Sequence, residues 1–198
     1  MTVAKAVSPR GFARERVLEA ALGLFAEHGV KGTSLQMIAD RLGVSKAAVY
    51  YQFHSKDDIA LAVIQPVFED MTRLVRIAEA MSTPEARREA AVSGMVELAV
   101  QHRRVTAVFH GDPVIDQLVH SREDLEETIE RLTAMLLGSA PEVTDRIVIS
   151  MLAAGVYGSA TDPTLSDVSD EDLRRVLLDC TQRLLRPRVG QDASAVSG

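Results

Sequence analysis

The chain has 198 residues, of which 46% are hydrophobic, and its formal net charge at pH 7 is −6. This length and apolar content predict a folded protein with one larger domain or two small ones, and they exclude an intrinsically disordered chain. They also exclude a helical membrane protein, because no apolar run approaches the roughly 20 residues that one span requires.

The N-terminal part of the chain shows the pattern of three short helices. They are expected at about residues 9–29, 35–42 and 45–53. Gly29 ends the first helix where a left-handed residue is needed. Thr33 or Ser34 caps the second helix, and Gly43 ends it. Ser45 is the N-cap of the third helix.

The remainder of the chain also follows a helical period. Ser55 caps a long helix that contains Pro66, so we expect a kink near residues 62–66. Another helix restarts at Pro84, and the sequence GDP at 111–113 breaks the pattern. Apolar stripes mark later helices at 125–136, 147–158 and 173–184. The chain is therefore predicted to be all-α, with about nine helices.

Residues 33–53 carry the clearest functional pattern. Two short helices joined by a tight turn with glycine are typical of a helix-turn-helix motif, whose second helix enters the DNA major groove. Val49 and Phe53 face the core on that helix. The side chains left outward are Ser45, Lys46, Ala47, Ala48, Tyr50 and Gln52. An ordinary corner of a helical bundle is the alternative interpretation.

The outward residues have chemistry that suits DNA. Alanines allow the backbone to approach base edges, and Lys46 can reach guanine or phosphate. Tyr50 and Lys56 can contact phosphates, and Arg10 and Arg14 can form a second phosphate clamp. Residues 1–56 hold eight Lys and Arg against four acids, a charge of +4, while residues 57–198 carry −10. This local excess is the electrostatic signature of a nucleic-acid-binding unit.

The segment TSLQMIADRLGVSKAAVYYQFHSKDDIALAV resembles the N-terminal domain of the tetracycline-repressor (TetR) family of bacterial transcription factors. The resemblance covers roughly residues 12–63. It implies a homodimer, and it places the residues that commonly touch DNA at Ser34, Gln36, Ser45, Lys46, Ala47, Tyr50 and Lys56. Gln52 stands where the family usually has an aromatic residue or histidine, and its phosphate role stays open. The ring of Tyr51 is expected to pack against the protein.

The resemblance also sets the expected domains: a three-helix helix-turn-helix DNA-binding domain at 1–54 and a C-terminal helical bundle for ligand binding and dimerisation at 55–187. A disordered tail is expected at 188–198. Residues 147–158 are too apolar for a solvent face, and the last helix has an apolar stripe, so both are expected in a four-helix dimer interface. Its predicted members are Met151, Ala154, Gly155, Gly158, Leu173, Val176, Leu177, Cys180 and Leu184. A monomer that buries both helices internally is the alternative.

A ligand pocket in this half is inferred by analogy with the family. The candidate lining is Phe68, Met71, Met95, His102, Phe109, His110, Met135 and Tyr157. Plain core packing is the alternative for each of them. The spacing of Asp116 and His120, near His110 and Asp112, is one that zinc can use, but a solvated helix face explains it better, so no metal site and no cofactor are predicted.

The sequence therefore predicts a regulator that binds a palindromic operator as a homodimer, by family default a repressor released by a small apolar molecule. A DNA-binding regulator or architectural protein without a small-molecule ligand is the alternative. No Glu-x-x-His pair, glycine-rich phosphate loop or catalytic triad signature is present, so an enzyme is not expected. The segment MTVAKAVSPRGF lacks the apolar core of a signal peptide, and the single Cys180 fits a reducing compartment, so we expect a cytoplasmic location.

Overall fold

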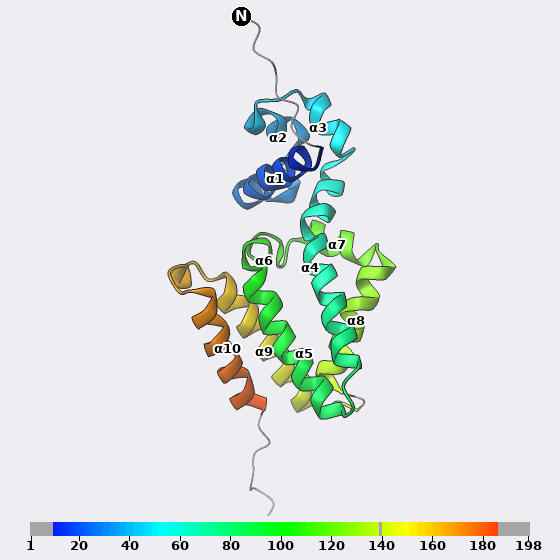
Figure 1. Cartoon of the computed structure of the whole chain (residues 1–198), viewed down its shortest axis with the longest axis vertical. Helices are drawn as coiled ribbons and strands as arrows, with labels where there is room; N and C mark the ends of the chain where they lie inside the picture. Colours follow the sequence, from blue (N-terminus) through cyan, green and yellow to red (C-terminus); the bar gives the residue numbers. More distant parts are fainter. Residues whose placement is uncertain (1–9, 139, 186–198) are drawn as a thin grey trace, which may run out of the picture.

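The computed structural model describes residues 10–138 and 140–185, with side chains from Ala13 onward. Within these ranges the chain forms ten α-helices, one short 3-10 helix and no strand, so the all-α prediction is confirmed. No helix in the described part of the chain is long and apolar enough to cross a membrane. Figure 1 shows α1 to α3 at one end of the molecule and the larger bundle at the other. The tail predicted at 188–198 lies outside the described residues.

The first three helices end where local signals in the sequence place their ends. Their bounds are Arg10–Gly32 (α1), Leu35–Leu42 (α2) and Lys46–Gln52 (α3). Ser34 caps α2, and Gly43 ends it with a left-handed φ of 65°. Ser45 caps α3. The helical backbone of α1 is interrupted at Gly29, whose φ is 70°, as predicted, although a last turn follows to Gly32.

The larger bundle contains one more helix than predicted. Its elements are Lys56–Glu79 (α4), Pro84–Gln101 (α5), Arg103–Phe109 (α6), Pro113–His120 (α7), Glu123–Leu137 (α8), Val143–Thr161 (α9), the 3-10 helix Pro163–Leu165 (η1) and Asp170–Leu185 (α10). About nine helices were predicted for the chain, and the additional one arises at His102, where a break separates α5 from α6. Helix α4 is continuous from its first residue to its last, with the exposed Pro66 inside it.

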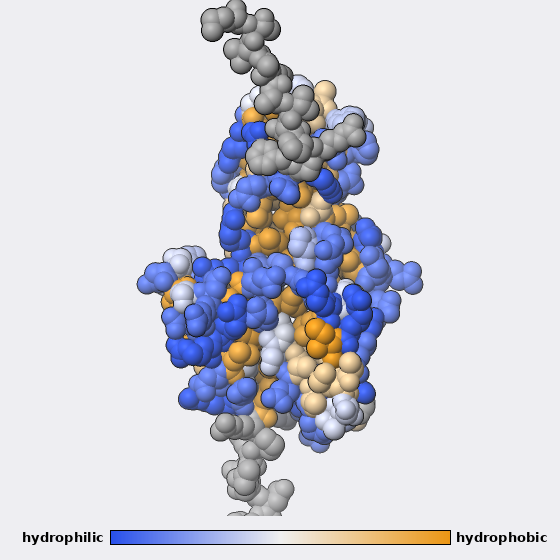
Figure 2. All heavy atoms as spheres, viewed as in Figure 1, coloured by the Kyte–Doolittle hydropathy of each residue, from blue (hydrophilic) through white to orange (hydrophobic). Residues whose placement is uncertain are grey.

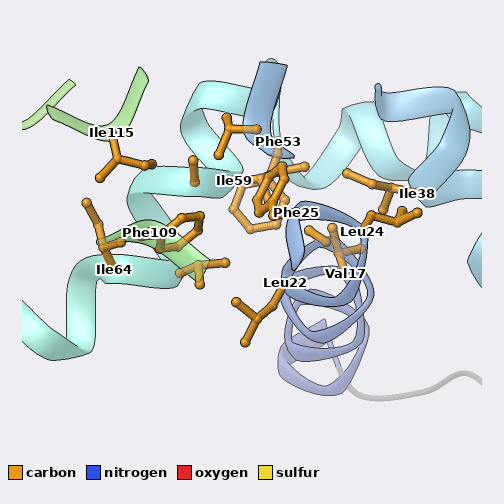
Figure 3. Close-up of a cluster of buried hydrophobic side chains, with 14 of the residues drawn as sticks. Val17, Leu22, Leu24, Phe25, Ile38, Phe53, Ile59, Ile64, Phe109 and Ile115 are labelled. Carbon is orange, nitrogen blue, oxygen red and sulfur yellow. The ribbon is translucent and has the colours of Figure 1, made fainter. Parts of the chain in front are cut away.

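Buried hydrophobic side chains form two cores. The first core, part of which is shown in Figure 3, joins α1 to α3 and the first half of α4 to α6, α7 and the start of α8. The rings of Phe25 and Phe109 meet in it, with centroids 5.7 Å apart. The second core joins the end of α4 to α5, α8, α9 and α10, and Met71 packs against both cores. The first core therefore extends beyond residue 54, where the DNA-binding domain was predicted to end.

The contact between the two ends of the molecule is apolar at its centre and charged at its edge. Figure 2 shows hydrophobic side chains at the waist of the molecule, where the N-terminal helices meet α6 and α7. At the surface, a guanidinium nitrogen of Arg104 in α6 lies 2.7 Å from a carboxylate oxygen of Glu19 in α1. Both side chains are largely exposed, so this ion pair adds little to stability. The shared apolar core is what holds the N-terminal helices on the bundle.

Helices α4 and α5 approach closely at Gly94. A Cβ atom added at this position would lie 2.0 Å from Cδ1 and 2.7 Å from Cγ of Leu74. We expect Gly94→Ala to force Leu74 into another rotamer or to push the helices apart, at a net cost of about 1–2 kcal/mol after the gain in helix propensity. The melting temperature, followed by calorimetry, should fall by roughly 2–6 °C.

Gly23→Ala in α1 is the matched control for this prediction. The nearest atom to an added Cβ there is Nη1 of Arg41, at 3.7 Å, which is ordinary contact. Alanine favours a helix over glycine, so this control should leave the melting temperature unchanged or raise it. If Gly94→Ala behaved in the same way, the close packing at Leu74 would carry no energetic weight.

Candidate DNA-binding site

The outward face of α3 is the centre of the candidate site. Val49 and Phe53 are buried in the first core and fix the rotation of this helix. Oγ of Ser45 accepts a hydrogen bond at 3.2 Å from a backbone N–H of the first turn. Lys46 and Ala47 lie exposed on that turn. Because these positions carry one flexible cation and one small methyl group, the N-terminal turn of α3 can approach the edges of base pairs.

The two neighbouring tyrosines of α3 both project outward. Tyr50 is 52% exposed, and its ring lies edge to face against His54 with centroids 5.3 Å apart. Tyr51 is 74% exposed, so the expectation that its ring packs is wrong. At 3.6 residues per turn, Tyr51 is rotated about 200° from the buried Val49, and this geometry points it to solvent. Tyr51 and the half-buried Gln52 border a shallow apolar groove between α3 and α1.

Two further predicted contacts lie at the start of α2, and both are exposed. Oγ of Ser34 accepts a hydrogen bond from the backbone N–H of Met37 at 3.2 Å, so this serine is the N-cap of the helix. The side-chain amide of Gln36 donates to the carboxylate of Asp40 at 2.7 Å. A DNA contact by Gln36 therefore requires this hydrogen bond to be exchanged, whereas Ser34 needs no change to present its hydroxyl.

The cations predicted to contact DNA differ in the contacts that they make within the protein. The side chain of Arg10 lies outside the described residues. The guanidinium carbon of Arg14 lies 4.4 Å from the centre of the Phe53 ring, a cation–π arrangement. Lys56 donates two hydrogen bonds to backbone carbonyls at the end of α1. Lys46 has no ion pair or side-chain hydrogen bond among the described residues, so it is the cation that α3 presents outward.

A cation that the sequence interpretation did not use orients α2 on α1. Arg41 donates two hydrogen bonds to the carboxylate of Glu27, at 2.7 and 3.1 Å. These hydrogen bonds hold the pKa of Glu27 below its ordinary value. Arg41 therefore serves the packing of the motif. The positive charge of the N-terminal segment is consequently shared between intramolecular contacts and the surface.

The residues predicted to line a ligand pocket are divided between the two cores. Phe68 and Phe109 belong to the first core and Met95 to the second, and Met71 contacts both, while Met135 and Tyr157 pack at the edge of the second. His102 lies at the junction of α5 and α6, where its Nε2 is 2.9 Å from a carboxylate oxygen of Asp70. The structure therefore does not gather these residues around a single cavity.

The second predicted pocket histidine also has a partner. The imidazole of His110 stacks on the ring of Tyr157 with centroids 5.4 Å apart, which joins the end of α6 to α9. Burial raises the pKa of the Tyr157 hydroxyl. Nearby, Asp112 caps α7, and Nδ1 of His120 lies 2.6 Å from the carbonyl oxygen of Asp116. Among the described residues, no three His, Cys, Asp or Glu side chains are grouped so that they could hold a metal ion.

A groove that the sequence interpretation missed lies between α4 and α8. Its volume is about 560 Å³, and Phe68 and Leu125 contribute apolar surface to it. Charged side chains make up much of the remaining lining, namely Glu69, Arg73, Arg76, Asp124, Glu127 and Arg131. These residues look like a solvated helix surface in the sequence, because only the packing of α4 beside α8 brings them together. The groove suits a polar or charged molecule better than the apolar one predicted.

The residues predicted for the dimer interface fall into an exposed set and a buried set. Met151, Val176 and Leu184 are 66%, 47% and 62% exposed, and Ala154, Gly155, Gly158 and Cys180 are exposed as well. Leu173 and Leu177 are a correction, since they are 5% and 7% exposed and pack into the second core of their own chain. Val143 and Ile147 are also exposed on α9, at four-residue spacing from Met151, and they were not among the predicted residues.

Comparison with known proteins agrees with this geometry. Residues 17–63 match the family described as bacterial regulatory proteins, tetR family. The transcriptional activator FasR of Mycolicibacterium smegmatis is 32% identical over 114 residues, which cover 56% of this chain and 52% of that protein. The transcriptional repressor AcnR of Corynebacterium glutamicum is 30% identical over 97 residues, 49% of this chain and 47% of that protein. The chain thus spans about half the length of these curated relatives.

Solved structures extend the likeness to nearly the whole chain. A TetR-like transcriptional regulator from Rhodococcus sp. RHA1 has a TM-score of 0.62 at 22% identity, over 89% of this chain and 97% of that one. A TetR-family member from Streptomyces coelicolor has a TM-score of 0.67 at 17% identity, over 94% and 96%. At these identities the likeness establishes the fold.

The fold and the site define a helix-turn-helix protein whose small N-terminal domain is joined to a larger helical bundle. Within that domain, residues 17–63 match the N-terminal family model of the bacterial regulatory proteins of the tetR family.

Proposed function

We propose that the chain is a DNA-binding transcriptional regulator that binds a palindromic operator as a homodimer. The observation that carries this proposal is the exposed first turn of α3, with Lys46 and Ala47 outward, held in place by the buried Val49 and Phe53. The positive charge of residues 1–56 supports it, because phosphate contacts supply much of the affinity for DNA.

The homodimer is supported by the exposed apolar stripes of α9 and α10. Met151 and Leu184 are each more than 60% exposed, and Val143, Ile147 and Val176 add exposed apolar surface on the same two helices. Apolar side chains that gather on one surface mark sites of protein–protein contact. Two chains related by a two-fold axis would present two copies of α3, and a separation of roughly 34 Å would place them in successive major grooves. Such a pair reads a palindrome, because the two half-sites are related by the same axis.

Small-molecule control is part of the proposal, with repression as its default sense. Helix α4 supports it, because this helix runs from the DNA-binding motif through both cores, with Met71 in contact with each. A ligand that favours one position of α4 would shift the separation of the two α3 helices. The groove between α4 and α8 is a candidate entry for such a ligand. A regulator without a ligand is the second candidate, because the predicted pocket residues fill the cores.

Selection from a pool of random 30-base-pair duplexes tests this function. We expect the full chain, at about 0.15 M salt, to enrich one inverted repeat that it prefers over unrelated duplexes by at least about 1,000-fold. Enrichment of no sequence, with binding that disappears as salt rises, would instead indicate an architectural protein. The enriched repeat, placed upstream of a reporter gene, then separates repression from activation by the sign of the change in transcription.

A further inference from the structure

Lys56 is the first residue of α4, yet its ammonium group bonds to the end of α1. Nζ lies 3.0 Å from the carbonyl oxygen of Val30 and 3.0 Å from that of Lys31. The side chain is half-buried rather than extended into solvent. Two of its three N–H donors are therefore used inside the protein. The sequence predicts a phosphate contact at Lys56, but its side chain is directed to the end of α1.

The two carbonyls that Lys56 reaches differ in their other partners: that of Val30 also accepts a hydrogen bond at 3.3 Å from the backbone N–H of Thr33, whereas that of Lys31 has no other donor among the described residues. The helical backbone of α1 is interrupted at Gly29, and the carbonyls of a last helical turn have no intrahelical partners. The buried Thr33 supplies one donor here, since its Oγ1 lies 2.9 Å from the carbonyl oxygen of Gly29 and 3.2 Å from that of Leu24. Lys56 serves the next two carbonyls. A cation is also favoured at this place because the C-terminal end of a helix carries partial negative charge.

The two ends of this contact enclose the whole helix-turn-helix motif. Val30 and Lys31 come just before α2, and Lys56 comes just after α3. The start of α4 is itself rigid, since Ser55 and Asp58 form a capping box with two hydrogen bonds of 3.0 Å. The segment 32–55 is therefore held at both ends.

We propose that Lys56 is a positioning residue that clamps α4 to the end of α1 and does not contact DNA phosphate. The clamp fixes the distance between the entry into α2 and the exit from α3, and it passes any displacement of α4 to the start of the motif. The inference deepens the proposed function and rests on it only for its DNA-binding part. The internal charge of the motif supports it, because Arg41 and Arg14 are likewise held by contacts within the domain.

Lys56→Met tests the clamp against a phosphate contact. Methionine keeps most of the aliphatic stem and removes the charge and the donors. For this variant we expect the melting temperature of the full chain to fall by roughly 2–6 °C, because the carbonyl of Lys31 loses its donor and that of Val30 keeps only the N–H of Thr33. Affinity for a random-sequence 30-base-pair duplex at 20 °C should fall by roughly threefold to tenfold at every salt concentration. The slope of log affinity against log salt should not change, because no phosphate contact is lost.

Lys46→Met is the matched control on the recognition helix. It removes the same group at a position where the side chain has no partner in the described residues, so the melting temperature should stay within about 1 °C and the salt slope should fall by about 0.9. A salt slope that falls by about 0.9 in Lys56→Met, with or without a change in melting temperature, would overturn the proposal. An unchanged melting temperature in that variant would also overturn it. If the unmodified chain bound no duplex even at low salt, the proposed function would fail, and the melting temperature alone would still decide whether the clamp exists.

Discussion

We expect Ala47→Asp to weaken binding to the selected inverted repeat by at least about 100-fold while the protein remains folded. Ala47 is the second residue of α3 and is exposed, so a carboxylate there meets no other part of the chain. It also lies where the partial positive charge of the helix start favours an acid, so the stability of α3 should be unchanged or slightly higher. In the major groove the same carboxylate faces phosphates and base edges that are rich in acceptors.

The measurement is a fluorescence-anisotropy titration at fixed salt, accompanied by a melting curve. Thr133→Asp on the exposed face of α8 adds the same charge far from α3 and should change the affinity by less than about twofold. Binding by Ala47→Asp equal to that of the unmodified chain would show that another surface reads the DNA. A loss in both variants would instead point to net charge as the cause.

The N-terminal motif could be predicted from the sequence because its boundaries are set by local interactions. Ser34, Gly43 and Ser45 each act within four residues of their own position, through caps and a left-handed turn. The exposure of Tyr51 could also be predicted, because its rotation from the buried Val49 follows from helical geometry alone. The expectation that its ring packs came from the family resemblance, and the helix geometry overrides it.

The features that the sequence did not reveal depend on contacts between distant residues. The break at His102 contains neither glycine nor proline, and its side chain bonds to Asp70 in another helix. The carbonyls that Lys56 reaches are 25 and 26 residues away along the chain. A pattern of residue types carries no signal for such pairs. A phosphate contact was therefore expected for Lys56 only because this residue lies at the start of a helix.

In the last helix, α10, helical periodicity predicts the apolar positions but not which of them are buried in the same chain. Its apolar positions predict one stripe, but α10 uses that stripe in two directions: Leu173 and Leu177 face the second core, and Val176 and Leu184 face outward. Helical periodicity indicates which residues share a face, and it does not say whether the same chain or another chain covers it. Only the packing of α10 against α5 and α9 separates the two sets.

That separation allows a sharp test of the homodimer at Met151. Met151 is 66% exposed in the middle of the apolar stripe of α9 and makes little contact within its own chain, so Met151→Glu should leave the fold intact. Burying an unpaired carboxylate between two chains costs several kcal/mol, and we expect the dimer to weaken by at least about 100-fold. Light scattering at micromolar concentration should then give the mass of one chain, where the unmodified protein gives twice that mass.

Ile77→Glu is the matched control for this change. Ile77 is 53% exposed on α4, a helix outside the proposed interface, so Ile77→Glu exchanges a similar apolar side chain for the same charge and should leave the dimer unchanged. The Met151→Glu monomer should also lose its preference for the inverted repeat over a single half-site, because the palindrome is read by two chains held together. A monomeric mass for the unmodified chain would remove the homodimer from the proposed function, and a Met151→Glu variant that remained dimeric would move the interface to another face.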